Sequence, residues 1–199
     1  MSYIIPAENA SLAAQERLRS GAERMAIKRL ANKLAVPEAK AFDPVNPAII
    51  VRDEDYVTDF VPVATQAGLA GWLSMPLIAI AGMYSIFANG AVPVAALTPQ
   101  VPNNQAWVFY GIEVLLADAA AENVTFIQFG IGVANNRRAQ FSLEGLYGGL
   151  NATGYFSQPI FYDPQEIANI QLRARLITGA GARVRLMTFI AEPIQTTVI

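Results

Sequence analysis

Residues 168–190, ANIQLRARLITGAGARVRLMTFI, carry the clearest secondary-structure signal in the chain. Apolar and polar residues alternate along 168–177 and again along 183–190, which is the period of a β-strand with one face in a core. Between the two, residues 178–182 (TGAGA) have the glycines of a turn. The stretch therefore predicts two strands that pair as an antiparallel hairpin, with Met187 on its outward face.

The outward face of this predicted hairpin also carries four arginines, Arg173, Arg175, Arg183 and Arg185. Like charges across a hairpin repel each other, so we expect this face to meet carbonyl groups or an acidic surface. The acidic cluster within residues 52–59, in the same chain or in a neighbouring subunit, is the candidate partner. The alternative is that the arginines serve solubility alone, because exposed ion pairs contribute little.

That acidic cluster contains Asp53, Glu54 and Asp55 and follows a short predicted strand at 48–51. Clustered carboxylates are able to bind Ca²⁺ or Mg²⁺, but the spacing of an EF-hand and its glycine are missing. We therefore interpret the cluster as a solvated acidic loop or as the partner of a basic surface on another subunit.

Further strand patterns lie upstream of the hairpin. The run 106–116 (AWVFYGIEVLL) is typical of a strand that is buried on both faces or lies at an interface. The pattern at 124–133 ends with Val133 on the apolar face, and 138–144 alternates with Phe141 and Leu143 inward. Seven or eight short strands with Gly, Pro and Asn turns predict a mainly β fold. We expect an antiparallel β-sandwich, with a jelly roll as the specific choice and an up-and-down barrel as the second.

The middle of the chain has no Asp, Glu, Lys or Arg between Asp59 and Glu113. Within it, residues 68–88 are apolar enough and long enough for a transmembrane helix. A central proline, three glycines and the lack of flanking Lys or Arg argue against a span. The other interpretation is a set of short buried strands at about 69–74, 77–86 and 91–96. We prefer the strands because strand patterns continue downstream, and a membrane span stays as the alternative.

The N-terminal region predicts a helix at 7–34, divided near Gly21 by a capping signal at 20–23. Its basic residues include Arg17, Arg24, Lys28 and Arg29. Three interpretations compete: a helix docked on its own domain, an arm that clamps a neighbouring subunit, and a patch that touches nucleic acid or anionic lipid. Residues 36–47 contain three prolines and resemble an extended linker. We therefore expect an N-terminal α-helical arm with its linker at 1–47 and a β-sandwich body at 48–199.

Composition limits the function classes. Only 15% of the 199 residues are charged and 53% are apolar, whereas an average soluble domain has about 25% charged residues. A lone monomer with such a surface would associate, so we expect a homo-oligomer. Cys and His are absent, and we expect no enzyme, no catalytic residue, no cofactor and no metal site. The net charge of −2 gives no general attraction to nucleic acid.

Three segments between residues 101 and 194, VPNNQAWVFYGIEV, FYDPQEIANIQLRA and RLMTFIAEPI, resemble the body strands of jelly-roll virion proteins of bacteriophages. This class includes capsid coat and cement (decoration) subunits. The resemblance implies a structural virion protein that is made in the host cytoplasm and located in the capsid. Its partners would be copies of itself and a major capsid or other virion protein. The chain is short for a coat subunit with the capsid fold of tailed phages, so a cement, minor or small coat role fits better.

The charged residues that we expect at subunit interfaces are Arg17, Arg24, Lys28, Arg29, Asp53, Glu54, Asp55, Arg173, Arg175, Arg183 and Arg185. Two other functions stay open. One is a membrane-associated protein that spans with 68–88. The other is a glycan-binding or hydrolytic β-sandwich that uses Glu113, Asp118 or Glu144 with exposed aromatic residues.

Overall fold

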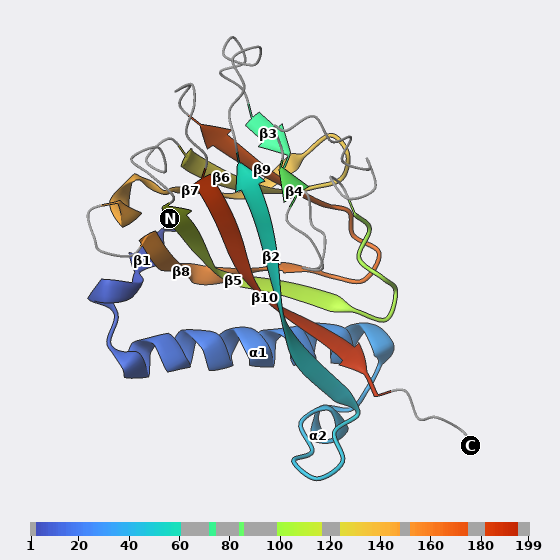
Figure 1. Ribbon diagram of the computed structural model, residues 1–199. Helices are drawn as coiled ribbons and strands as arrows, with labels where there is room; N and C mark the ends of the chain where they lie inside the picture. The colour runs from blue at the N-terminus through green and yellow to red at the C-terminus, as the bar shows by residue number, and fades with distance from the viewer. Residues whose placement is uncertain are drawn as a thin grey trace.

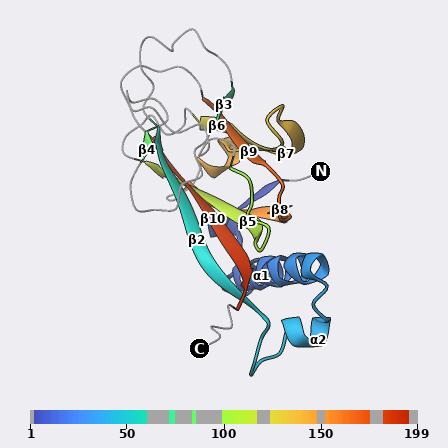
Figure 2. The same cartoon turned by 90° about the vertical axis from the view of Figure 1, so that its right-hand side faces the viewer.

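Two β-sheets and one long helix make up the described part of the chain (Figure 1). The structure is a computed structural model and describes residues 3–60, 72–74, 84–85, 99–116, 124–147, 152–174 and 182–194. The elements form three layers: the four-stranded sheet, the six-stranded sheet in the middle, and helix α1 (Leu12–Leu34) on its other side (Figures 1 and 2).

The strands of the six-stranded sheet lie in the order β1 (Ile4–Pro6), β8 (Ala152–Tyr162), β5 (Ala106–Leu116), β10 (Ala182–Pro193), β2 (Ile49–Phe60) and β4 (Tyr84–Ser85). The four-stranded sheet has the order β3 (Trp72–Ser74), β9 (Ala168–Ala174), β6 (Val124–Ile131) and β7 (Asn136–Ser142). All pairs are antiparallel except β2 with β4. The prediction of a mainly β, antiparallel fold is confirmed.

In the body, strands near the two ends of the sequence pair with each other, and strands nearer the middle pair in turn. β2 pairs with β10, β3 with β9, β5 with β8, and β6 with β7. Two further pairings, β5 with β10 and β6 with β9, join these pairs into the two sheets. The chain therefore crosses from one sheet to the other between β2 and β3, β3 and β4, β5 and β6, β7 and β8, β8 and β9, and β9 and β10.

The predicted hairpin of residues 168–190 is wrong. Its two strands exist as β9 and β10, but β9 lies in the four-stranded sheet and β10 in the six-stranded sheet. The alternation of apolar residues determines which face of each strand is buried, and it does not determine which strand lies alongside. The four arginines consequently do not share one face: Arg173 belongs to one sheet, Arg183 and Arg185 to the other.

An aromatic cluster fills the space between the sheets. Phe109 of the six-stranded sheet lies 5.6 Å from Phe129 of the four-stranded sheet, measured between ring centroids. Phe156 then stacks on Phe141 at 4.6 Å. The hydroxyl of Tyr162 donates to the carbonyl oxygen of Gly130 at 2.9 Å, so the polar end of this buried ring is satisfied. These contacts join the two sheets into one core.

Strand β5 is buried on both faces, as its continuous apolar run predicted. Trp107, Phe109 and Ile112 pack into the core between the sheets. Val108 and Tyr110 point the other way and pack under α1. The six-stranded sheet thus needs a cover on each side.

Helix α1 starts and ends at clear sequence signals. The Ser11 side chain accepts a hydrogen bond from the backbone N–H of Ala14 at the N-terminus. At the C-terminus Ala35 adopts a left-handed conformation, and the backbone N–H of Val36 donates to Ala31 O. The helix is continuous through Gly21, so the predicted division there is wrong. A single glycine costs only about 1 kcal/mol in a helix that is held by packing.

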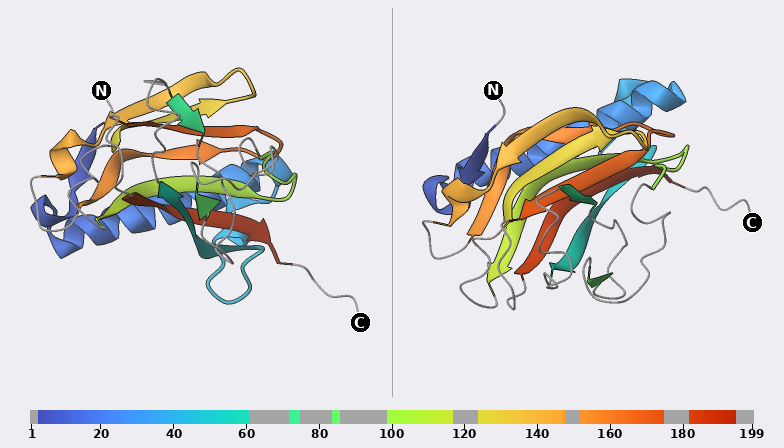
Figure 3. Two further views of the ribbon diagram at one scale, coloured as in Figure 1. Left: turned by 45° about the horizontal axis from the view of Figure 1, so that its top comes forward. Right: turned by 90° about the horizontal axis from the view of Figure 1, so that it is seen from above.

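The buried face of α1 consists of small residues. Ala22, Ala26 and Leu30 have no exposed surface and lie on the outer face of the six-stranded sheet. The alanines let the helix approach the stacked pair Tyr110 and Phe189, whose ring centroids are 4.7 Å apart. In the view from above, the strands lie in front of α1 (Figure 3). The structure therefore shows the docked arrangement for the N-terminal helix, and the short helix α2 (Glu38–Ala41) follows it.

The uncharged middle of the chain lies largely outside the described residues. Within the predicted strands at 69–74, 77–86 and 91–96, the described residues are those of β3 and β4, which are strands. The remaining residues of these predictions and of the predicted span at 68–88 are not described. Within the described residues, no helix has both the length and the apolar character that crossing a membrane requires.

Strand β6 ends two residues earlier than predicted. Gly132 follows Ile131 with a φ of 77° and turns the chain. Val133 is therefore 75% exposed instead of continuing the apolar face. The alternation at 138–144 is confirmed, because Phe141 and Leu143 are buried.

Replacing Phe129 by Ala tests the core between the sheets. Phe129 has no exposed surface and contacts rings from both sheets, so Phe129→Ala should lower the free energy of unfolding by about 3–5 kcal/mol. Urea denaturation measures this change, and Val133→Ala is the control, expected within about 0.5 kcal/mol of the parent. An equally small loss for Phe129→Ala would contradict the packing described.

Candidate interaction surface

Ion pairs connect α1 to the sheet beneath its N-terminal half. An Arg19 guanidinium nitrogen lies 2.5 Å from Asp53 Oδ2, with both side chains about half exposed. Arg185 of β10 lies between two carboxylates: its Nε is 2.9 Å from Glu113 Oε2, and its Nη1 is 3.7 Å from Asp55 Oδ2. The Nε is not aligned for a hydrogen bond, so this contact is an ion pair only. Arg19, Asp53, Asp55 and Arg185 line a cavity of about 370 Å³ between the helix and the sheet.

The environment of this cluster shifts two ionisable groups. Burial raises the pKa of the Asp55 carboxyl, and the Arg185 charge only partly opposes this rise. The neighbouring carboxylates of Asp53 and Glu113 raise the pKa of Asp55 further. Burial also raises the pKa of Tyr110 to about 12, so its hydroxyl stays neutral at physiological pH.

A second cluster attaches the C-terminal half of α1. The Arg29 guanidinium lies 3.4 Å from the ring centroid of Phe161, and the Arg138 guanidinium lies 4.7 Å from the same centroid. Arg138 also makes hydrogen bonds of 3.0 and 3.2 Å to the two carboxylate oxygens of Glu166. Arg29 lies 3.7 Å from Asp163 Oδ2. Stacking and charge together therefore tie α1 to β8 and to the turn that follows it.

A groove runs between α1 and α2 and has a volume of about 1010 Å³. Arg24 and Lys28 of α1 line one side, and Glu38 and Phe42 line the other. Met25 also lines the groove and packs partly into the core under the helix. Arg24 and Lys28 are exposed, and neither forms an ion pair within the described ranges.

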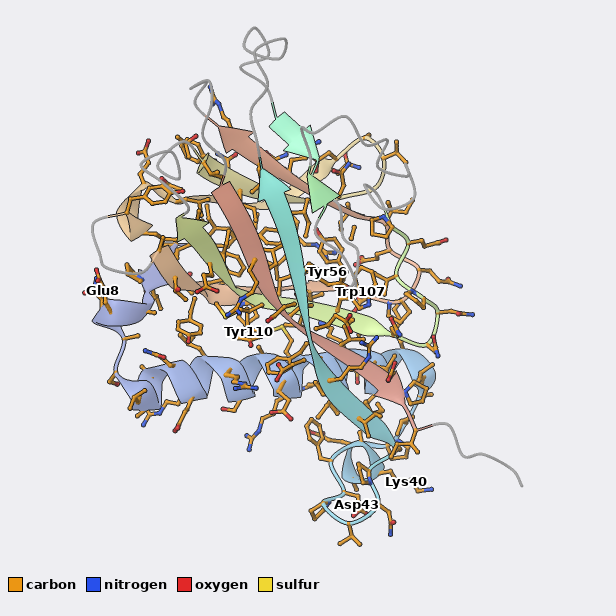
Figure 4. All side chains as sticks on the ribbon, viewed as in Figure 1. Glu8, Lys40, Asp43, Tyr56, Trp107 and Tyr110 are labelled. Carbon is orange, nitrogen blue, oxygen red and sulfur yellow. The ribbon has the colours of Figure 1, made fainter. Side chains whose placement is uncertain are left out.

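A group of exposed apolar residues lies after α2 in the sequence, near the start of β2 and the end of β10. Tyr56 and Trp107, whose ring centroids are 5.8 Å apart, lie in the core between the sheets (Figure 4). Near the start of β2, Ile50 is 41% exposed, and directly after β10, Ile194 is 42% exposed. The two are diagonal neighbours on one face, because Ile50 lies opposite Glu192. Val45, in the loop between α2 and β2, is 79% exposed. We call Val45, Ile50 and Ile194 the apolar overhang.

The structure places the predicted interface residues in different environments. The sequence analysis interpreted the acidic cluster as a solvated loop or as the partner of a basic surface. In the structure, the acidic residues Asp53, Glu54 and Asp55 lie in strand β2. Asp53, Glu54 and Asp55 pair within the chain with Arg19, Arg52 and Arg185, respectively. The expected contact between the acidic cluster and a β10 arginine therefore exists within one chain.

Of the remaining predicted residues, Arg29 packs on Phe161. Arg17, Arg24, Lys28 and Arg173 are exposed. Arg175 and the side chain of Arg183 lie outside the described residues.

Sequence reasoning missed four members of the clusters, namely Arg19, Arg138, Glu113 and Glu166, as interface or anchoring residues. Glu113 had a usable signal, because it is the single charge inside the buried run of β5. A charge in such a strand needs a partner of opposite sign. The other three are ordinary surface residues by sequence, and only the pairing of distant strands brings them together.

The described residues contain no group of three or more Asp or Glu side chains placed to hold a metal ion. The acidic side chains of β2 are instead opposed by arginines.

No protein-family model matches the chain, and no curated protein matches it closely enough to count as a relative. Among solved structures, the chain is similar to a chain of the acid-stable capsid of Helicobacter pylori bacteriophage KHP30. The two share 9% sequence identity with a TM-score of 0.36, over 71% of this chain and 92% of that one. A TM-score of this size does not establish a shared fold.

Replacing Asp55 by Asn tests the electrostatics beneath α1. A raised pKa means that folded Asp55 binds its proton more tightly than unfolded Asp55 does. Its contribution to stability is therefore fully present below the unfolded pKa, near 3.8, and is lost as the pH rises through the folded pKa. Asp55→Asn should accordingly become more stable relative to the parent as the pH rises from about 4 to neutrality. Urea denaturation across this range measures the difference.

Asp43→Asn is the matched control with the opposite sign. Backbone N–H groups of Asn46 and Val45 lower the pKa of Asp43, so its contribution is present above the unfolded pKa and is lost as the pH falls. Asp43→Asn should therefore lose stability relative to the parent as the pH rises. The same pH trend in both variants would contradict the assignment for Asp55.

Proposed function

We propose that this chain is a structural virion protein of a bacteriophage, a cement, minor or small coat subunit with a jelly-roll body. The observation that carries the proposal is the apolar overhang, an exposed apolar surface on a chain with few charges. The fold adds support by analogy only, since one architecture serves many functions.

The strand order supports the jelly roll. A jelly roll forms when one long antiparallel ribbon of eight strands wraps into two sheets. Such a ribbon pairs the first strand with the last, the second with the next to last, and so on to the centre. The pairs β2 with β10, β3 with β9, β5 with β8 and β6 with β7 follow this scheme. In this interpretation β1 and β4 are additions at the edges of the six-stranded sheet.

The surface supports association between copies. Ile50 lies near the start of β2, and Ile194 directly follows β10, where its backbone N–H donates to Ala48 O; both side chains are exposed. Val45, in the loop before β2, is exposed as well. Clustered apolar side chains at a projecting edge are typical of a protein–protein contact. We propose that the partners are copies of this chain and a major capsid or other virion protein, with the capsid as location.

A binding role is preferred over catalysis, and we propose that the chain is not an enzyme. Glu113, which a glycan-cleaving site would use, is held by Arg185 beneath α1. Glu144 lies in the short 3-10 helix Glu144–Leu146, on the exposed surface. Glu16, Asp53 and Asp55 line one cavity, but Asp53 and Asp55 are paired there with Arg19 and Arg185. A glycosidase needs two carboxylates that both act on the same glycosidic bond.

Light scattering on the purified protein tests the proposal. The parent should have a mass in solution well above the 21.4 kDa of one chain. The double variant Ile50→Lys/Ile194→Lys should shift to the mass of one chain, because two charges cannot be buried at an apolar contact. Val133→Lys, at a more exposed apolar residue of the β6–β7 turn, should keep the parent mass. A parent that is monomeric at all concentrations would contradict association through the overhang.

A further inference from the structure

Two of the cations that line the groove between α1 and α2, Arg24 and Lys28, have no ion-pair partner in the described part of the chain. Arg24 and Lys28 are four residues apart and therefore lie next to each other on one face of the helix. Like charges at this spacing repel each other and destabilise a helix. Both side chains are exposed, and neither meets a carboxylate among the residues that the structure describes.

The other cations of α1 that contact the sheet are already engaged. Arg19 pairs with Asp53, and Arg29 packs on Phe161 near Asp163. Arg29 also lines the groove, but its guanidinium packs on Phe161, so Arg24 and Lys28 are the groove cations that stay open to a partner among the described residues. An acidic group bound there would relieve the repulsion between the two.

The rest of the groove is suited to an apolar side chain. Phe42 is 37% exposed and faces α1 from the end of α2, while Met25 is half-buried beside it. Gly21 leaves additional space, since a Cβ there would meet no atom within 4 Å. Methionine and aromatic side chains adapt well to an inserted apolar group.

These features favour a protein segment over a nucleic acid. Glu38 lines the wall opposite Arg24 and Lys28. A nucleic acid carries a charge at every phosphate and would meet Glu38, whereas a peptide can place its acidic side chains on the side of Arg24 and Lys28 alone. An apolar floor with two cations on one side matches a peptide in which acidic and apolar residues alternate.

We propose that the α1–α2 groove is a docking site for an acidic segment of another protein. The acidic side chains of this segment pair with Arg24 and Lys28, and an apolar side chain inserts between Met25 and Phe42. The overhang lies outside this groove, so the docking site is independent of the self-association described above.

Fluorescence anisotropy with a labelled peptide of alternating Glu and Leu tests this site. The protein used is the Ile50→Lys/Ile194→Lys variant, so that loss of self-association cannot be mistaken for loss of docking. The peptide should bind, and Arg24→Glu/Lys28→Glu should weaken binding by at least about tenfold, equivalent to about 1.4 kcal/mol. Arg17→Glu is the matched control: it changes the charge of the same helix outside the groove and should change binding less than about twofold.

Two reciprocal probes complete the test. A peptide of alternating Lys and Leu should bind the Arg24→Glu/Lys28→Glu variant better than it binds the parent groove, which also shows that the variant is folded. A labelled single-stranded oligonucleotide should bind the parent more weakly than the acidic peptide does. The proposal is overturned if the acidic peptide does not bind, or if Arg17→Glu weakens peptide binding as much as Arg24→Glu/Lys28→Glu does. It is also overturned if the oligonucleotide binds the parent more tightly than the acidic peptide does.

Discussion

The six-stranded sheet must be covered on both faces, and the rest of the structure depends on this constraint. Its central strands β5 and β10 present large apolar residues on each side. The four-stranded sheet covers one side and α1 covers the other. Burying one large apolar side chain contributes roughly 1.5–3 kcal/mol. Removing α1 would expose Tyr110, Met187 and Phe189 together, so the helix is a part of the fold and not an appendage to it.

Charges are distributed in agreement with this arrangement. Apolar contacts hold the centre of α1, while ion pairs and arginine–aromatic contacts lie along its borders. The Arg19–Asp53 pair is about half exposed and therefore adds little stability by itself. The carboxylates around Arg185 are less exposed, and burial raises the pKa of Asp55 in spite of the Arg185 charge. The pairs Arg19–Asp53 and Arg29–Asp163 join α1 to the rest of the fold, while Arg24 and Lys28 face solvent.

Local patterns in the sequence predicted elements well and contacts poorly. Alternation identified β7, β9 and β10, and the apolar run identified β5 as buried on both faces. The alternation could not reveal that β9 and β10 lie in different sheets, because each strand pairs with strands that are far away in the sequence. The sequence analysis did not identify Ala22 and Ala26 as residues of the buried face of α1, because alanine is weakly hydrophobic and is an ordinary helix former. The contact of Asp55 with Arg185 was predictable from opposite charge, whereas the groove required the position of α2.

Native-state hydrogen exchange, followed in low denaturant on dilute protein, tests most directly whether α1 belongs to the domain it covers. If it does, the backbone amides of Ala26 and Leu30 open only with global unfolding. Their opening free energy should then equal that of the Val108 amide in β5 and should not depend on protein concentration. Opening of the α1 amides at a much lower free energy, or protection that increases with concentration, would contradict the account and indicate a helix that is held by a neighbouring chain.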